Sequence, residues 1–119
     1  MTIRLELVKG FHEKFKIPVL NAPSLISSDR STHRYNLMKE EVEEYSMGAQ
    51  NGDLENIAKE LADILYATYG TILEHGLQDK FDQIFEEVHR SNMSKDYGEF
   101  KMIKGDSYFK SDLKKILDK

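Results

Sequence analysis

The chain has no cysteine and no tryptophan, and its 119 residues include only two prolines, Pro18 and Pro23. The lack of cysteine excludes disulfides and thiolate metal sites, which fits the reducing cytoplasm where we expect this protein. No apolar stretch is long enough to span a membrane and no signal-peptide pattern opens the sequence, so we expect no membrane partner. The formal net charge of −4 argues against a nucleic-acid polymer as a partner.

Apolar residues recur at helical spacing along a chain whose length suits one domain, residues 1–119. The pattern predicts helices at about residues 1–15, 29–51, 54–75 and 79–94. Because most of the links are short, we expect an all-α fold resembling an antiparallel four-helix bundle, with its helical core at about 2–95. The tail, 96–119, is predicted to be irregular, with a loop or hairpin near 97–109 and a short last helix capped by Ser111.

The third predicted helix is apolar almost all round its axis, as the positions of Leu61, Ile64, Tyr66 and Tyr69 illustrate. This pattern is typical of a helix that is buried on most sides. One small subunit has too few other helices to cover such a surface. We therefore expect a second copy of the chain to pack against it, as a homodimer or, alternatively, within a tetramer.

Acidic residues gather at two places, in Glu40–Glu44 and in Glu60–Asp63. At about 100° per residue, Glu40, Glu41 and Glu44 share one side of the second helix, whereas Glu43 points away. Glu60 and Asp63 are three residues apart and share a side of the apolar third helix. Carboxylates in such a place lose hydration and repel one another, so they require a cation.

A divalent metal ion is the natural cation, because no run of Lys or Arg is interleaved on these faces. Mg²⁺ prefers oxygen ligands and leaves positions open for water or phosphate. Such ions neutralise a polyphosphate, and a spare glutamate near the bound water acts as general base. A solvated acidic surface is the alternative for Glu40–Glu44, but it suits Glu60 and Asp63 poorly.

Glu-Glu-x-x-Glu followed by Glu-x-x-Asp resembles the signature of the all-α nucleoside triphosphate pyrophosphohydrolases, which include the MazG proteins. Residues 87–95 are similar to the branch related to phosphoribosyl-ATP pyrophosphohydrolase. The resemblance implies a MazG-like fold and Mg²⁺-dependent cleavage (Mn²⁺ is possible) between the α and β phosphates of a nucleoside triphosphate. It implies nucleotide-pool house-cleaning as the role. The metal ligands that it implies are Glu40, Glu41, Glu44, Glu60 and Asp63, with Glu41 and Glu60 as the catalytic candidates.

Polar residues near the end of the fourth helix are candidates for binding the substrate. Asn92 and Lys95 continue the apolar stripe of that helix, and an amide and an ammonium there suit a base edge and a phosphate. A helix cap and a helix-dipole partner are the alternatives. Lys104 and Tyr108, in the basic tail, are candidates for closing over phosphates, although a solvated tail is an equal alternative.

The first helix supplies a further set of candidates, Phe11, His12 and Phe15, which either line a pocket for the base or, as we favour, belong to the core.

Two other interpretations stay open. Glu86-x-x-His89 has the spacing of di-iron bundles, but no second such motif is present. A non-catalytic dimeric helical module that binds a metal or a partner is the alternative to an enzyme. Within the family resemblance, Tyr66-Ala67 lacks the Tyr-His pair expected of histidine-pathway members, which argues against a role in histidine biosynthesis.

Overall fold

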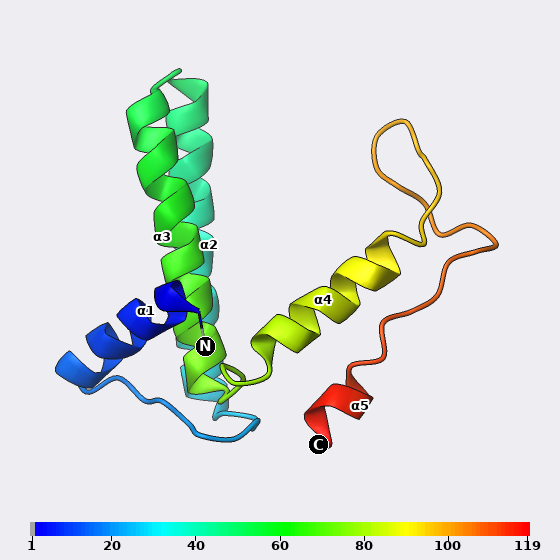
Figure 1. Cartoon of the computed structure of the whole chain (residues 1–119). Helices are drawn as coiled ribbons and strands as arrows, with labels where there is room; N and C mark the ends of the chain where they lie inside the picture. Colours follow the sequence, from blue (N-terminus) through cyan, green and yellow to red (C-terminus); the bar gives the residue numbers. More distant parts are fainter. Residues whose placement is uncertain (1) are drawn as a thin grey trace. The chain divides into compact units, whose positions relative to one another are not determined.

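A computed structural model describes residues 2–119 and shows an all-α protein, as predicted (Figure 1). Its backbone forms two compact units, Met1–Gln78 and Asp79–Lys119, called here the first and second unit. Within residues 2–119 the only β pairing is an isolated bridge between Asp96 and Ile103. The helices are α1 Ile3–Lys14, α2 Ser28–Gln50, α3 Leu54–Glu74, α4 Phe81–Asn92 and α5 Lys114–Leu117.

Helices α2 and α3 form an antiparallel pair that lies side by side along most of its length (Figure 1). The Ser27 hydroxyl accepts a hydrogen bond from the Arg30 N–H at 3.2 Å, which caps α2. Asp53 caps α3 in the same way through the Asn56 N–H at 3.1 Å, as the sequence predicted. Between the two helices, Gly52 adopts φ 66° and reverses the chain within three residues. The tight link fixes which parts of the two helices face each other.

Helix α1 packs across α3 and completes the core of the first unit. Leu5 and Val8 on α1, and Ile72 and Leu73 on α3, are buried. By contrast, Leu61, Leu65 and Tyr66 are exposed in the single chain. Helices α1 and α2 cover only part of α3, in agreement with the expectation that one subunit cannot bury this helix on most sides. The second copy that would cover the rest stays a prediction.

The loop between α1 and α2 is held against the end of α3 by hydrogen bonds. The Leu20 N–H donates to the Leu73 carbonyl at 3.0 Å, and the Gln78 amide donates to the Leu20 carbonyl at 2.7 Å. The Ser24 N–H donates to the His75 carbonyl at 2.9 Å. Gly76, with φ 67°, ends α3 beside this loop. These bonds fix the path of the loop without regular secondary structure.

In the second unit, Glu87 on α4 organises the segment that follows. Its carboxylate accepts hydrogen bonds from Arg90 and from the Asp112 N–H at 2.6 Å, which lower the pKa of Glu87 to about 2. The predicted Ser111 cap is wrong, because the last helix begins two residues later. Leu113 occupies its N-cap position and offers no side-chain hydrogen bond.

None of the helices described is long and apolar enough to cross a bilayer.

Gly76 and Gly52 provide a matched pair for testing the anchored loop. Both have a positive φ, but a Cβ on Gly76 would collide with the backbone of Ala22, whereas a Cβ on Gly52 meets nothing within 4 Å. We expect Gly52→Ala to lower the free energy of unfolding by about 1 kcal/mol, the cost of the left-handed conformation. Gly76→Ala should cost about 3 kcal/mol or more, because the loop must also move. Urea unfolding measures both, and equal costs would contradict the close packing of the loop.

Candidate functional site

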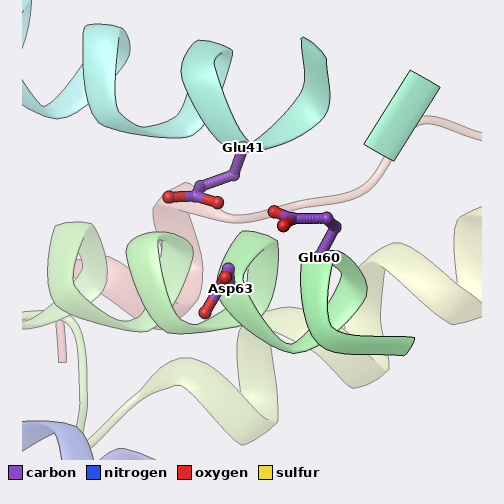
Figure 2. A group of neighbouring side chains, drawn as sticks. All are labelled: Glu41, Glu60 and Asp63. Atoms are coloured by element: carbon purple, nitrogen blue, oxygen red, sulfur yellow. The ribbon is translucent and has the colours of Figure 1, made fainter. Parts of the chain in front are cut away.

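Three acidic side chains from α2 and α3 meet in the first unit and form what we call the carboxylate cluster. Glu41 comes from α2, and Glu60 and Asp63 come from α3; one oxygen of each lies within 4.8 Å of the others (Figure 2). Glu60 is only 4% exposed, and Glu41 and Asp63 are half-buried. The antiparallel pairing of the helices and the three-residue spacing of Glu60 and Asp63 bring these groups together.

Burial and neighbouring carboxyl groups raise the pKa of Glu41 in the cluster and of Glu44 beside it. The pKa of Glu41 rises to about 7, first because of burial and then because of the Glu60 carboxyl and the charges on Glu44 and Asp63. The pKa of Glu44 is also raised, mainly because its carboxyl lies beside that of Glu60.

Two buried carboxylate oxygens, Glu41 Oε2 and Glu60 Oε2, have no hydrogen-bond partner. Contact between these two carboxyl groups becomes a hydrogen bond only when one of them carries a proton. When both are ionised, a cation is the group that can satisfy the two oxygens together. The all-oxygen donor set fits a hard divalent ion such as Mg²⁺ or Mn²⁺.

One basic side chain reaches the cluster, although no run of Lys or Arg is interleaved on these faces. Lys59 Nζ lies 2.7 Å from Asp63 Oδ2 and 3.7 Å from Glu60 Oε1. The Lys59 side chain is largely exposed, so solvent screens this pair and it contributes little to stability. One exposed ammonium cannot balance Glu41, Glu44, Glu60 and Asp63, and the charge excess remains.

The other predicted ligands lie at the margin of the cluster. Glu44 is half-buried beside Glu60, whereas Glu40 is exposed and contributes to the site through the charge that it adds near Glu44. Glu43 is exposed, in line with its predicted direction away from the site. The roles of Glu40 and Glu44 as ligands stay predictions.

A cavity of about 500 Å³ opens beside the cluster, and we call it the carboxylate cavity. Glu41 and Asp63 contribute to its wall, together with Phe11 and Tyr66, whose rings meet edge-on at 5.4 Å. His12 also lines the cavity although it is buried, so it serves both the core and the pocket. Phe15 packs against Phe11 at 4.8 Å between ring centroids and is not among the lining residues.

An ionic network that the sequence did not predict lies at the part of this cavity lined by Arg30 and Arg34. Glu74 is 0% exposed and accepts hydrogen bonds from Arg30 at 2.8 and 2.9 Å, and Arg34 Nη1 lies 3.2 Å from the same carboxylate. Arg34 also donates to Thr71 Oγ1 and to the Ala67 carbonyl. An acidic residue at the C-terminal end of an apolar helix is unfavourable by itself, which was the available signal for a partner of Glu74.

His12 is held in one tautomer at this network. Its Nδ1 lies 3.1 Å from the Pro18 carbonyl, which can only accept, so Nδ1 carries the proton. Burial, opposed in part by that hydrogen bond, lowers the pKa of His12 and keeps the ring neutral. Gly70 provides the space, because a Cβ there would collide with both Arg34 and His12.

The second unit contains another cavity, of about 550 Å³, which brings together three of the predicted substrate residues. Asn92, Lys95 and Lys104 line it, and Lys101 adds a third ammonium. Tyr108 is not among the lining residues, but its ring lies 5.3 Å from Lys104 Nζ. We call this cavity of the second unit the lysine cavity.

Across residues 2–119 the carboxylate cluster is the one group of three or more metal-ligating side chains, so Glu86 and His89 gain no third ligand.

A comparison with known protein families gives a match. A family model described as phosphoribosyl-ATP pyrophosphohydrolase matches residues 8–92. The matched region holds both acidic groups, the arginine network and Asn92, and it ends before Lys95, Lys104 and Tyr108. A search of curated proteins finds no match to the chain.

The carboxylate cluster predicts an unusual pH dependence of stability. Because the folded-state pKa of Glu41 is about 7 rather than 4.5, the folded state binds more protons than the unfolded state between these values. The contribution of Glu41 to the free energy of unfolding therefore falls as pH rises through this window. In EDTA, we expect the melting temperature of Glu41→Gln to exceed that of the wild type at pH 8 by more than it does at pH 5.

The comparison with Glu41→Gln isolates this contribution from that of His12, whose lowered pKa acts in the opposite direction. Adding Mg²⁺ at pH 8 should raise the melting temperature of the wild type and change that of Glu41→Gln much less. A difference between the two proteins that is constant from pH 5 to 8 would contradict the raised pKa of Glu41.

Proposed function

The chain belongs to the phosphoribosyl-ATP pyrophosphohydrolase family, and from this premise we propose that it is a Mg²⁺-dependent pyrophosphohydrolase of nucleoside triphosphates. The family lies within the all-α, MazG-like superfamily, and its members are hydrolases that act on phosphoric anhydride bonds. The chain is thus an enzyme of that class. The proposed reaction cleaves the bond between the α and β phosphates and releases the monophosphate and pyrophosphate.

The observation that carries this proposal is the carboxylate cluster with its two buried, unpartnered oxygens. Glu41, Glu60 and Asp63 would hold the ion, Mg²⁺ or alternatively Mn²⁺, and Glu44 and Glu40 would complete the set around a second ion or its waters. A bound ion of this kind neutralises phosphate charge and lowers the pKa of water. Displacement of Lys59 from Asp63 would free both oxygens of that carboxylate at a small energetic cost.

The side chains themselves supply the proton transfer. Hydrolysis requires a base to take a proton from water as its oxygen attacks phosphorus. We propose that Glu41 or Glu60 is that base, because both carry an oxygen that makes no other hydrogen bond. Removal of water from around these oxygens strengthens their interaction with a proton, since burial disfavours the charged form.

The carboxylate cavity is the proposed site of the nucleoside. Phe11 and Tyr66 present aromatic surface next to Asp63, and a base stacks well on such rings. Within the second unit, the lysine cavity is a separate proposed anion site: Lys95 and Lys104 line it, Tyr108 lies beside Lys104, and Asn92 offers an amide. We propose house-cleaning of non-standard or surplus nucleotides as the role, since Tyr66-Ala67 departs from the histidine-pathway pattern.

A second copy of the chain is the proposed partner. Leu61 and Leu65 on α3, and Ile3 and Leu7 on α1, expose large apolar side chains. Burying such a surface between two copies is favourable at roughly 25 cal/mol per Å², and two-fold symmetry is the commonest arrangement. Light scattering on the protein as it elutes from a size-exclusion column separates dimer from tetramer, and a monomeric mass would refute this proposal.

We also propose a cytoplasmic location, in keeping with the cysteine-free sequence.

A substrate panel tests the reaction. We expect the protein with Mg²⁺ to release pyrophosphate and a monophosphate, without orthophosphate, from at least one member of a panel of ribo- and deoxynucleoside triphosphates. Chromatography of the products identifies the bond that is cleaved. If a correctly folded protein cleaves no member of the panel and no phosphoribosyl-ATP, the non-catalytic module becomes the better interpretation.

Substitutions in the cluster test the residues. We expect Glu41→Gln and Asp63→Asn each to lower kcat by about 100-fold or more, because each removes a ligand or base while keeping the side-chain volume. Glu43→Gln is the matched control, since Glu43 lies on the same helix, is exposed and stays outside the cluster. Circular dichroism confirms folding. Near-normal activity of either cluster variant would exclude its residue from the catalytic machinery.

A further inference from the structure

The carboxylate cavity has charges of opposite sign in different parts of its wall. Glu41 and Asp63 provide the acidic part, and Arg30, Arg34 and Lys16 provide the basic part. Arg30 precedes Glu41 by eleven residues on α2, which places the two backbones ~16 Å apart along the helix axis. A ligand that fills the cavity therefore meets a metal-binding carboxylate set at one end and guanidinium groups at the other.

Arg30 and Arg34 differ in how many of their N–H donors remain without an acceptor. Arg34 is 5% exposed, and its Nε, Nη1 and Nη2 contact Thr71, Glu74 and Ala67, respectively. Arg30 is 37% exposed and binds Glu74 through Nε and Nη2 only. A guanidinium has five N–H donors, so three donors of Arg30 remain, and within residues 2–119 its side chain makes no other hydrogen bond.

Charge at this end of the cavity is not balanced. The single carboxylate of Glu74 compensates one of the two guanidinium groups that contact it. Lys16 adds a further positive charge, and it does so from a left-handed backbone conformation, φ 57°, that costs a residue other than glycine about 1–2 kcal/mol. The first turn of α2, which holds Arg30, also presents the positive end of the helix dipole.

We infer that Arg30, anchored by the buried carboxylate of Glu74, binds a phosphoryl group of the substrate at the end of the cavity remote from the carboxylate cluster. A planar guanidinium fixed on one edge and free on the other matches the geometry of phosphate oxygens. The inference rests on the proposed function only for placing the scissile anhydride at the cluster.

Two parts of a substrate can supply this phosphoryl group. One is a phosphate ester on the base side of the nucleotide, as in the phosphoribosyl group that the family description names. The other is the terminal phosphate of the polyphosphate chain, if the chain runs along the cavity. Both have the same chemistry at Arg30, and they differ in which ligands depend on it.

Binding to the full-length protein in EDTA tests the inference without turnover. The probes are ribose 5-phosphate, with ribose as its uncharged counterpart, and inorganic tripolyphosphate, each measured by calorimetry. We expect at least one phosphorylated probe to bind the wild type, and Arg30→Gln to weaken it about 10-fold or more. Arg30→Lys should recover part of the affinity, because it keeps the charge and loses the planar fork.

Lys39→Gln is the matched control, because it removes the same charge from an exposed position on α2 that does not line the cavity. Its probe affinity should equal that of the wild type. Loss of ribose 5-phosphate binding in Arg30→Gln, with the KM for nucleoside triphosphates unchanged, assigns the group to the base side. A KM that rises about 10-fold for triphosphates, but not for diphosphates, assigns it to the terminal phosphate.

Two results overturn the inference: no phosphorylated probe binds the wild type, or the wild type and Arg30→Gln bind the probes equally. Either of these results, obtained with a protein that hydrolyses nucleotides, leaves the proposed function standing. The opposite result is also possible: the protein cleaves no nucleotide, but its probe binding depends on Arg30. That result rejects the proposed reaction and supports the anion site.

Discussion

The length-wise contact between α2 and α3 is the constraint on which the rest of the first unit depends. It places Glu41 against Glu60 and Asp63 at one level of the helix pair, and Arg30 and Arg34 against Glu74 at another. Each level concentrates charge where the two helices exclude water. The pair is closed by the three-residue link around Gly52, which leaves little freedom for one helix to slide along the other.

These two levels treat buried charge in different ways. At Glu74 the chain supplies its own counter-ions, and the carboxylate is fully hydrogen-bonded. At Glu41 and Glu60 it supplies almost none, and burial together with the neighbouring carboxyl groups raises the pKa of Glu41 to about 7. Such a group of carboxyl groups is relieved either by a proton or by a cation from outside the chain. The contrast within one helix pair is the reason why we propose the second group, and not Glu74, for metal binding.

Much of this arrangement could be predicted from the sequence, because it follows from local periodicity. Helical spacing placed Glu60 and Asp63 on one side and turned Glu43 away, and the cap at Asp53 followed from its position before an apolar run. The partners of Glu74 could not be predicted in this way. Arg30 lies forty-four residues away in the chain, and nothing in its neighbourhood distinguishes it from a solvated arginine. Lys59, by contrast, precedes Asp63 by four residues, so helical spacing alone could have placed the two side chains together.

The buried carboxylate of Glu74 has a consequence for how this sequence can diverge. Leaving a buried charge without its partners costs about 3–5 kcal/mol, a large share of the 5–15 kcal/mol that holds a typical domain folded. Arg34 and Glu74 can therefore not be exchanged one at a time without passing through an unstable intermediate. Arg30 is freer, since Arg34 still pairs with Glu74 when Arg30 is replaced. Within this network, substitutions at position 30 can thus change ligand preference while the fold is retained.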